Sequence, residues 1–377
     1  MKADLSPKYV HKINESIVLW FEHSNRYVVT SKSTYPLIKL FLRVENQSNF
    51  IDSLSDSTQI EHKAAEDLYL EISNFLEDAN TPLEKNHPYS PSIVIPECHT
   101  IRCYDFDGTT IKVNFQTDVI ESLIHPQIEH HLTHLNSNFN IEFDIFKTGD
   151  TLQLFKNKKY LGSYSTESFH FLQGKFALEL TNAIHNTQAD KWIATFHAST
   201  VTNNSEAIMI VGDSGNGKST LSALLMAHGF DVLTDDFSPL YKDMHIYRYP
   251  AAISIKKGAF HILEVYLKDF DLLKTHTNGP KKVNLKYLPP SSKFSTSKSN
   301  FPCSTIVSVK FDSTKPSELT EVSIQNILET LIPESWISPD DTHALQFLNW
   351  LENVKCYELC YRDNDFAISK FKSLFDI

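Results

Sequence analysis

One stretch of the sequence combines glycines, a lysine and hydroxyl residues at a spacing suited to binding a phosphate chain. The pattern G-x-x-x-x-G-K-[ST] is matched by Gly212, Asp213, Ser214, Gly215, Asn216, Gly217, Lys218 and Ser219, with Thr220 next in the chain. Glycines let backbone N–H groups curl around phosphate oxygens, and the following helix N-terminus adds partial positive charge. In this pattern Lys218 reaches the β- and γ-phosphates, and Ser219 holds Mg²⁺. Residues 212–220 therefore predict a site for a nucleotide's phosphate chain with Mg²⁺, and leave open which phosphate chemistry the loop serves.

Two adjacent carboxylates follow at a distance that one helix and one strand can fill. Asp235 lies 17 residues after Lys218, and Asp236 is next to it. This spacing allows a helix of about three turns, a glycine turn and a short strand. A right-handed crossover would return that strand parallel to the apolar run 208–211, with both carboxylates at the same edge as the glycine-rich loop. One carboxylate could then act through Mg²⁺, and the other could accept a proton from an attacking hydroxyl.

The elements that position these residues belong to an α/β pattern that begins at residue 191. Strands are expected over 192–202, 208–211, 230–234, 246–256, 303–311 and 355–361, and helices over 321–331 and 341–352, with a short closing helix. The region 93–190 predicts strands over 99–106, 110–115, 141–147, 151–156 and 159–164, and helices over 118–135 and 168–186. Its Asp107-Gly108 pair predicts a hairpin turn.

The first 80 residues have a different pattern. A hairpin over 16–30 precedes helices over 34–43, 47–55 and 60–77, the last being the clearest amphipathic helix of the chain. Polar residues and prolines over 81–92 predict a linker. The expected organisation is a small winged-helix-like α+β domain over 1–80, the linker over 81–92, a mixed α/β region over 93–190 and an α/β domain over 191–377.

Composition excludes several classes of function. A net charge of −11 over 377 residues gives no electrostatic footprint for nucleic acid or an anionic membrane. No apolar run reaches the roughly 18 residues of a membrane span, and five cysteines in a long chain predict reduced thiols in a cytoplasm. The sequence has no LSGGQ-like segment of a transporter ATPase, no NKxD-type base reader of a GTPase and no arginine-rich lid of a small nucleoside kinase.

Three segments in order resemble the catalytic core of HPr kinase/phosphorylase and its relatives, namely His197-Ala198-Ser199, GDSGNGKST at 212–220 and HGFDVLTDD at 228–236. Weaker similarity continues to the end of the chain. The resemblance implies the P-loop fold shared with phosphoenolpyruvate carboxykinase. It also implies Asp236 as catalytic base, Asp235 as a Mg²⁺-binding or base-orienting group, and His197 as a residue that positions or charges the site. The downstream substrate signature of the bifunctional enzymes is not found, and Thr220 stands where those enzymes usually have Glu.

The N-terminal order of a two-stranded wing, a short helix, a linking helix and a long helix resembles the PqqD family. Domains of that family bind leader peptides of ribosomally made, modified peptides by adding the peptide as a strand to the wing edge. A generic helical cap on the kinase is the alternative. Because HPr kinase relatives commonly assemble, the resemblance also implies that copies of this chain can form a homo-oligomer.

The leading hypothesis is an ATP- and Mg²⁺-dependent kinase that phosphorylates a hydroxyl, with a serine of a precursor peptide as the expected acceptor. One alternative is a kinase for free serine or another small hydroxyl metabolite. The alternative from another class is a nucleotide-gated binding or regulatory protein with little or no phosphotransfer. No nucleic-acid or membrane partner is expected.

Overall fold

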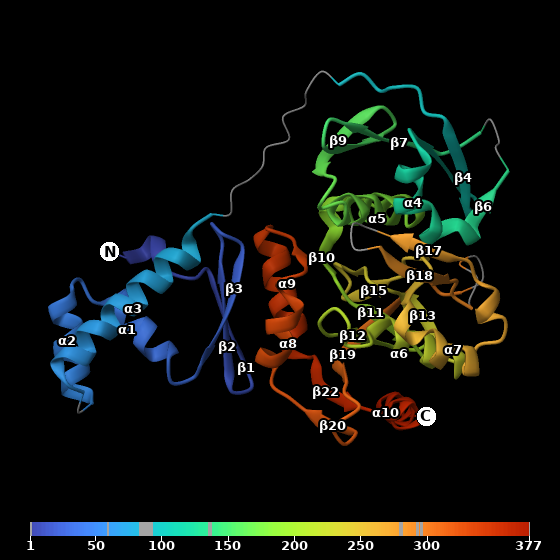
Figure 1. Ribbon diagram of the computed structural model, residues 1–377. Helices are drawn as coiled ribbons and strands as arrows, with labels where there is room; N and C mark the ends of the chain where they lie inside the picture. The colour runs from blue at the N-terminus through green and yellow to red at the C-terminus, as the bar shows by residue number, and fades with distance from the viewer. Residues whose placement is uncertain are drawn as a thin grey trace.

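The computed structural model describes residues 2–58, 60–82, 93–134, 138–278, 282–291, 294 and 297–376. These residues form a mixed α/β fold with several sheets (Figure 1), which confirms the predicted fold class at this coarse level. Ten residues of the predicted linker, 83–92, lie outside the described part of the chain. None of the helices in that part combines the length and apolar character needed to cross a bilayer.

The N-terminal segment contains an antiparallel sheet and three helices. Its elements are β1 Tyr9–Ile13, β2 Ser16–Phe21, β3 Arg26–Ser31, α1 Tyr35–Arg43, α2 Gln47–Ser57 and α3 His62–Asn80, in sheet order β1-β2-β3. The predicted hairpin and helices are confirmed, but strand β1 was missed because its pattern of half-buried residues is short and polar. The side chains of β2 alternate between two apolar clusters, so both faces of this sheet are covered.

The region after the linker builds a six-stranded sheet in the order β6-β4-β5-β7-β8-β9. Its elements are β4 Thr100–Phe106, β5 Thr109–Phe115, α4 Asp118–Ile128, β6 Leu132–Thr133, β7 Ile141–Thr148, β8 Thr151–Lys156, β9 Lys159–Ser165 and α5 His170–Ile184. Asp107 and Gly108 both have positive φ, as the predicted hairpin turn requires. The predicted helix over 118–135 was too long, because α4 ends at Ile128 and β6 pairs with β4.

The largest sheet follows the order β13-β11-β12-β19-β15-β14-β10-β21, with β22 beside β19 and β20 beside β22. Its strands are β10 Trp192–Phe196, β11 Ser199–Thr202, β12 Ala207–Val211, β13 Asp231–Thr234, β14 Ser238–Tyr241, β15 His245–Tyr247, β19 Asn300–Phe311, β20 Glu318–Glu321, β21 Trp336–Ile337 and β22 Lys355–Tyr361. A smaller sheet joins β16 Ile253–Lys256, β18 Val283–Leu288 and β17 Thr275–Asn278.

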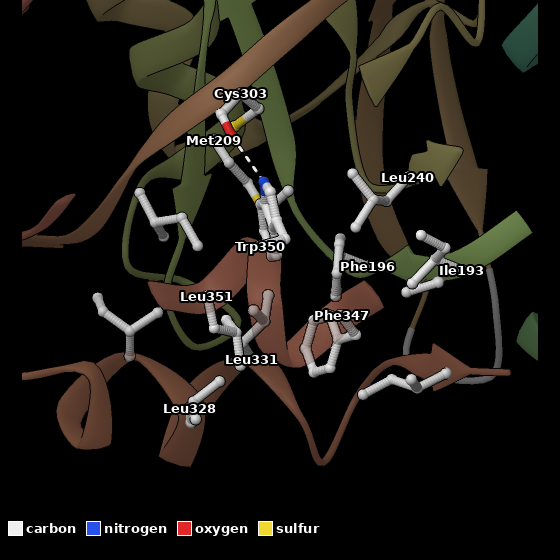
Figure 2. Close-up of a cluster of buried hydrophobic side chains, with 14 of the residues drawn as sticks. Ile193, Phe196, Met209, Leu240, Cys303, Leu328, Leu331, Phe347, Trp350 and Leu351 are labelled. Atoms are coloured by element: carbon white, nitrogen blue, oxygen red, sulfur yellow. Dashed lines mark hydrogen bonds between the residues drawn. The ribbon is translucent and has the colours of Figure 1, made fainter. Parts of the chain in front are cut away.

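Helices cover both faces of the large sheet. They are α6 Lys218–Ala227, α7 Phe260–Tyr266, α8 Ile324–Leu331, α9 Asp341–Glu352 and α10 Asn364–Leu374. Alternate residues of β12 enter two clusters, one with α8 and α9 and the other with α6 and α10, as expected for a strand buried on both faces. Figure 2 shows Phe347 and Trp350 of α9 pointing toward the sheet, where Trp350 Nε1 donates to the Cys303 carbonyl oxygen at 2.7 Å.

The N-terminal sheet packs directly on α9, as Figure 1 shows. The Tyr27 and Phe347 rings meet edge to face with centroids 5.1 Å apart, and Lys8 pairs with Asp341 at 2.9 Å. One face of this sheet therefore belongs to the same apolar cluster as the core around α8 and α9. Two surfaces that share a cluster bury each other's apolar area, so the N-terminal segment and the core stabilise each other.

Two predicted strands of the core are interrupted. The run 192–202 forms β10 and β11 with a break at His197 and Ala198, and the run 246–256 forms β15 and β16 with an irregular segment over 248–252. Both runs were predicted as continuous strands because they are rich in apolar, aromatic and β-branched residues. The first break is decisive for the site, because β11 and β10 are each second from opposite ends of the sheet order.

Candidate active site

The glycine-rich loop, residues 212–217, lies between the end of β12 and the start of α6. Gly212, Gly215 and Gly217 have φ values of 147°, 99° and 94°, which are conformations that glycine adopts far more readily than other residues. Lys218 is the first residue of α6, and its buried side chain donates from Nζ to the Gly212 carbonyl oxygen at 2.5 Å. The lysine thus curls back over the loop, where its ammonium group faces the space that a phosphate chain would take.

Two of these glycines are also required by close packing. A Cβ on Gly212 would lie 2.7 Å from the Val309 carbonyl oxygen, and a Cβ on Gly217 would lie 3.1 Å from the Tyr361 hydroxyl. Both neighbours belong to the parallel strands β19 and β22, which follow β12 in the sheet. The loop therefore presses against the sheet edge and is held in one conformation.

The remaining loop residues complete the turn. Asn216 N donates to the Asp213 carbonyl oxygen at 3.1 Å, and the Asn216 carbonyl oxygen accepts from Phe311 N at 3.1 Å. Ser214 lies at the exposed side of the loop, where its hydroxyl oxygen is 3.1 Å from Lys256 Nζ. Thr220 lies in the first turn of α6. Sequence reasoning missed Lys256, although its place at the end of the expected strand 246–256 was a signal.

The predicted carboxylate pair lies at the same sheet edge as the loop. Strands β13 and β12 are both antiparallel to β11, which lies between them, so β13 runs parallel to β12. Their carboxyl ends share an edge, which confirms the predicted crossover geometry. Asp235 follows β13 immediately and is buried, whereas the side chain of Asp236 is 58% exposed. The two carboxylates thus have different environments, because Asp235 is shielded from solvent and Asp236 is open to it.

Asp235 accepts two hydrogen bonds. Its Oδ1 accepts from Ser199 Oγ at 2.5 Å, and its Oδ2 accepts from Ser254 N at 3.1 Å. Burial raises the pKa of Asp235 to about 6, the Asp236 charge adds to that rise, and the neighbouring Ser199, Ser254 and Ser219 donors oppose it. A buried carboxylate of this kind would be stabilised in its ionised form by a cation.

The residues around Asp235 fit Mg²⁺. Ser219 and Asp235 were predicted as the Mg²⁺ ligands, and the Ser219 side chain is close enough to Asp235 to lower the pKa of its carboxyl. A hydroxyl and a carboxylate are the hard oxygen ligands that Mg²⁺ takes together with phosphate oxygens. Sequence reasoning missed Ser199 and Ser254. Both donate hydrogen bonds to the carboxylate from the side of the sheet, and these bonds orient it. Their role was not readable from the sequence because each reaches Asp235 from a different strand.

His197 and Asp236 meet where two antiparallel strand pairs are interrupted opposite each other. Phe196 pairs with Ser238 on one side of the break, and Thr200 pairs with Thr234 on the other. Residues 197–199 therefore lie across from residues 235–237, and the side chains in the gap are free to leave the sheet. His197 Nε2 lies 3.1 Å from Asp236 Oδ1.

Asp236 has a φ of 66°, in the left-handed region that aspartate tolerates better than most residues. Non-glycine residues in this region cluster at functional sites, where surrounding contacts hold them. Here the unusual conformation turns Asp236 away from the buried position of Asp235. The structure thus brings the loop, Asp235, Asp236 and His197 to one sheet edge.

Glu334 is a further acidic residue of this site that sequence reasoning missed. Its Oε2 lies 3.6 Å from His197 Nε2, and it reaches the site from the segment between α8 and β21. No motif marks it in the sequence.

No protein-family model and no curated protein matches the sequence. Among solved structures, the chain is similar to the HPr(Ser) kinase/phosphatase from Coxiella burnetii, with 10% sequence identity and a TM-score of 0.21. The match covers 48% of this chain and 94% of that chain. At this TM-score the similarity carries no argument about fold or activity.

Proposed function

We propose that this protein is an ATP- and Mg²⁺-dependent kinase that transfers a phosphoryl group to a hydroxyl, with a serine of a ribosomally made precursor peptide as the acceptor. The observation that carries the proposal is the meeting of the glycine-rich loop and the carboxylate pair at one sheet edge, since β12, which leads into the loop, and β13, which leads into Asp235 and Asp236, run parallel on either side of β11. This arrangement supports a phosphate-binding loop with a buried carboxylate as cation ligand and a second, exposed carboxylate beside it.

Each group has a distinct task in this reaction. The loop amides and Lys218 bind the triphosphate and stabilise the charge that develops on the migrating phosphoryl group. Mg²⁺ held by Ser219 and Asp235 would neutralise phosphate charge when the nucleotide is bound. Asp236 accepts the proton of the acceptor hydroxyl as its oxygen attacks the γ-phosphorus and the bond to the ADP oxygen breaks. His197 orients the Asp236 carboxylate through the 3.1 Å contact.

Peptide recognition is proposed for the N-terminal segment, as a domain over 1–80. Within the described residues, β3 pairs only with β2, so its other edge carries backbone groups that an added strand could pair with. The turn between β2 and β3 contacts the core, since Asn25 Nδ2 donates to the Ile337 carbonyl oxygen at 2.8 Å. A peptide docked on β3 would therefore have its local concentration raised near the core.

The test uses the intact chain with γ-labelled ATP, Mg²⁺, a panel of serine peptides and free L-serine. Asp236→Asn is expected to abolish label transfer while ATP binding is retained, and Asp243→Asn, an exposed carboxylate on another turn, should leave transfer unchanged. If ATP binds but no acceptor becomes labelled, the kinase proposal fails and a nucleotide-gated regulatory protein is favoured.

Competition distinguishes the acceptors. A peptide acceptor predicts that excess unlabelled leader segment, added in trans, slows transfer to the full peptide. A kinase for free serine or another small hydroxyl compound predicts no such competition. Truncation of residues 1–80 is a poor substitute for this test, because it would expose the apolar cluster around Tyr27 and Phe347.

A further inference from the structure

Glu334 and Asp236 both lie near the same nitrogen atom of His197. Glu334 Oε2 lies 3.6 Å from His197 Nε2, and Asp236 Oδ1 lies 3.1 Å from the same atom. We infer that Glu334 is a positioning residue that acts on Asp236 through His197 during phosphotransfer, an inference that rests on the proposed function. The side chain of Glu334 is 57% exposed, so its place at the site has to be explained by the backbone that carries it.

Strand register explains this placement. Strands β10 and β21 are antiparallel, with Ala194 opposite Ile337 and Thr195 opposite Trp336. When this register is continued by two residues, Glu334 lies opposite His197. Opposed residues of an antiparallel pair share a face of the sheet, with Cβ atoms about 5 Å apart. The pairing of β10 with β21 therefore brings the segments that carry His197 and Glu334, just beyond the ends of these strands, side by side.

The segment that carries Glu334 is fixed at both ends. Ser335 N donates to the Ile332 carbonyl oxygen at 3.1 Å, which closes a turn after α8, and Ser338 N donates to the Ile193 carbonyl oxygen at 2.8 Å. The N-terminal segment adds the bond from Asn25 to Ile337. A backbone held at these points keeps the Glu334 carboxylate within reach of His197.

The shared nitrogen suggests how the three side chains work together. His197 Nε2 carries at most one hydrogen atom, and the negative charges of Asp236 and Glu334 both attract the imidazole. While the imidazole is held against Asp236 Oδ1, that oxygen is less able to accept the proton of the acceptor hydroxyl. The Glu334 charge, 3.6 Å from the same nitrogen, draws the imidazole the other way, so His197 can release Asp236 when the acceptor hydroxyl arrives. Without the Glu334 charge, His197 remains on Asp236 and transfer slows.

A double-mutant cycle tests this coupling in the full chain. Glu334→Gln is expected to lower kcat about tenfold, with the KM for ATP changed less than about twofold, and Glu334→Asp should recover part of the loss. In a His197→Gln background the Glu334→Gln substitution should have no further effect. The control is Glu329→Gln on α8, because Glu329 accepts from Gln325 Nε2 at 3.0 Å, away from His197. Additive effects of the His197 and Glu334 substitutions would overturn the inference.

A spectroscopic measurement separates this inference from the proposed function. Nitrogen NMR of the histidine rings, with His197 assigned from the His197→Gln spectrum, should show that its Nε2 resonance moves in Glu334→Gln and stays in place in Glu329→Gln. An unchanged resonance in Glu334→Gln overturns the inference even if the kinase is active. If no acceptor is ever phosphorylated, the proposed function fails together with the catalytic part of the inference, and a moved resonance then supports the contact alone.

Discussion

Ser199 Oγ donates a hydrogen bond to Asp235 Oδ1 over 2.5 Å, and both side chains are buried. The hydroxyl orients one oxygen of the carboxylate, and it favours the ionised form against the burial that raises the pKa of Asp235. It does both from β11, the strand that separates β12 from β13. The orientation of the Asp235 carboxylate therefore depends on a residue of the strand between β12 and β13.

Ser199→Ala is expected to weaken Mg²⁺-dependent ATP binding about tenfold, because a hydrogen bond to a charged group contributes roughly 1.5–3 kcal/mol. Titration calorimetry with ATP at saturating and limiting Mg²⁺ measures the change. Ser222→Ala is the matched control, since this buried hydroxyl donates only to the Lys218 carbonyl oxygen within α6. Equal effects of the two substitutions would show that the Ser199 hydroxyl has no special relation to the cation site.

The local parts of this site could be predicted from the sequence, and the cross-strand parts could not. The glycine pattern and the spacing to Asp235 define a loop, a helix and a strand that follow one another, so their relation depends on short connections. Ser199, Ser254 and Glu334 reach the site from separate strands or connections, and nothing in a single sequence marks which strands pair.

The break in the strand at His197 is a second feature that the sequence alone does not predict. The residues of 192–202 are apolar and β-branched enough to predict one strand, and no glycine or proline interrupts them. The strand is divided because Ala198 and Ser238 meet there, with Ser238 Oγ donating to the Ala198 carbonyl oxygen at 2.8 Å. The interruption is thus set by tertiary contacts. The sequence places His197 in the site only through the resemblance to HPr kinase/phosphorylase.

Gly212→Ala is expected to abolish ATP binding and to lower the free energy of unfolding. The added Cβ would lie 2.7 Å from the Val309 carbonyl oxygen, a backbone atom that cannot move aside without disturbing β19. Gly229→Ala is the control, because Gly229 also has a positive φ, of 94°, but a Cβ there meets nothing within 4 Å. The control should show only the backbone strain of about 1–2 kcal/mol and normal ATP binding. Urea unfolding and equilibrium ATP binding measure the two variants. Normal ATP binding by Gly212→Ala would contradict the described fit of the loop.

Acid is expected to destabilise the segment that leads to β16. The Pro250 carbonyl oxygen accepts from His130 Nε2 at 3.1 Å and from His131 Nε2 at 2.9 Å, and the Arg248 carbonyl oxygen accepts from His185 Nε2 at 2.8 Å. Burial lowers the pKa of His130 to about 3, and burial also lowers the pKa values of His131 and His185. These neutral rings stabilise the fold above about pH 6.5, and their contribution is lost as the pH falls, since the unfolded chain binds the protons.

His130 is itself exposed, so solvent screens part of this effect and the loss for His130 alone is smaller than its pKa shift would give for a fully buried ring. Asp235 acts with the opposite sign, because its raised pKa of about 6 favours the fold at low pH. The measurement is therefore a comparison of the drop in unfolding free energy from pH 7.5 to pH 5 between the wild type and His130→Asn, whose amide donates without titrating. The drop should be smaller in the variant, whereas His62→Asn, at an exposed position on α3, should keep the wild-type drop. Equal drops in wild type and His130→Asn would rule out a role for this ring in the acid response.

Tyr27 joins the N-terminal sheet to α9 through its ring and leaves its hydroxyl buried without a hydrogen-bond partner in the described part of the chain. Burial raises the pKa of this hydroxyl, so it remains a neutral, unsatisfied group. Tyr27→Phe keeps the ring contact and removes the buried polar atom, so the free energy of unfolding should rise by about 1 kcal/mol. Tyr27→Ala removes the ring from the shared cluster and should lower it by about 3–5 kcal/mol. Urea unfolding followed by tryptophan fluorescence measures both variants, and a Tyr27→Phe protein less stable than wild type would show that the hydroxyl has a partner after all.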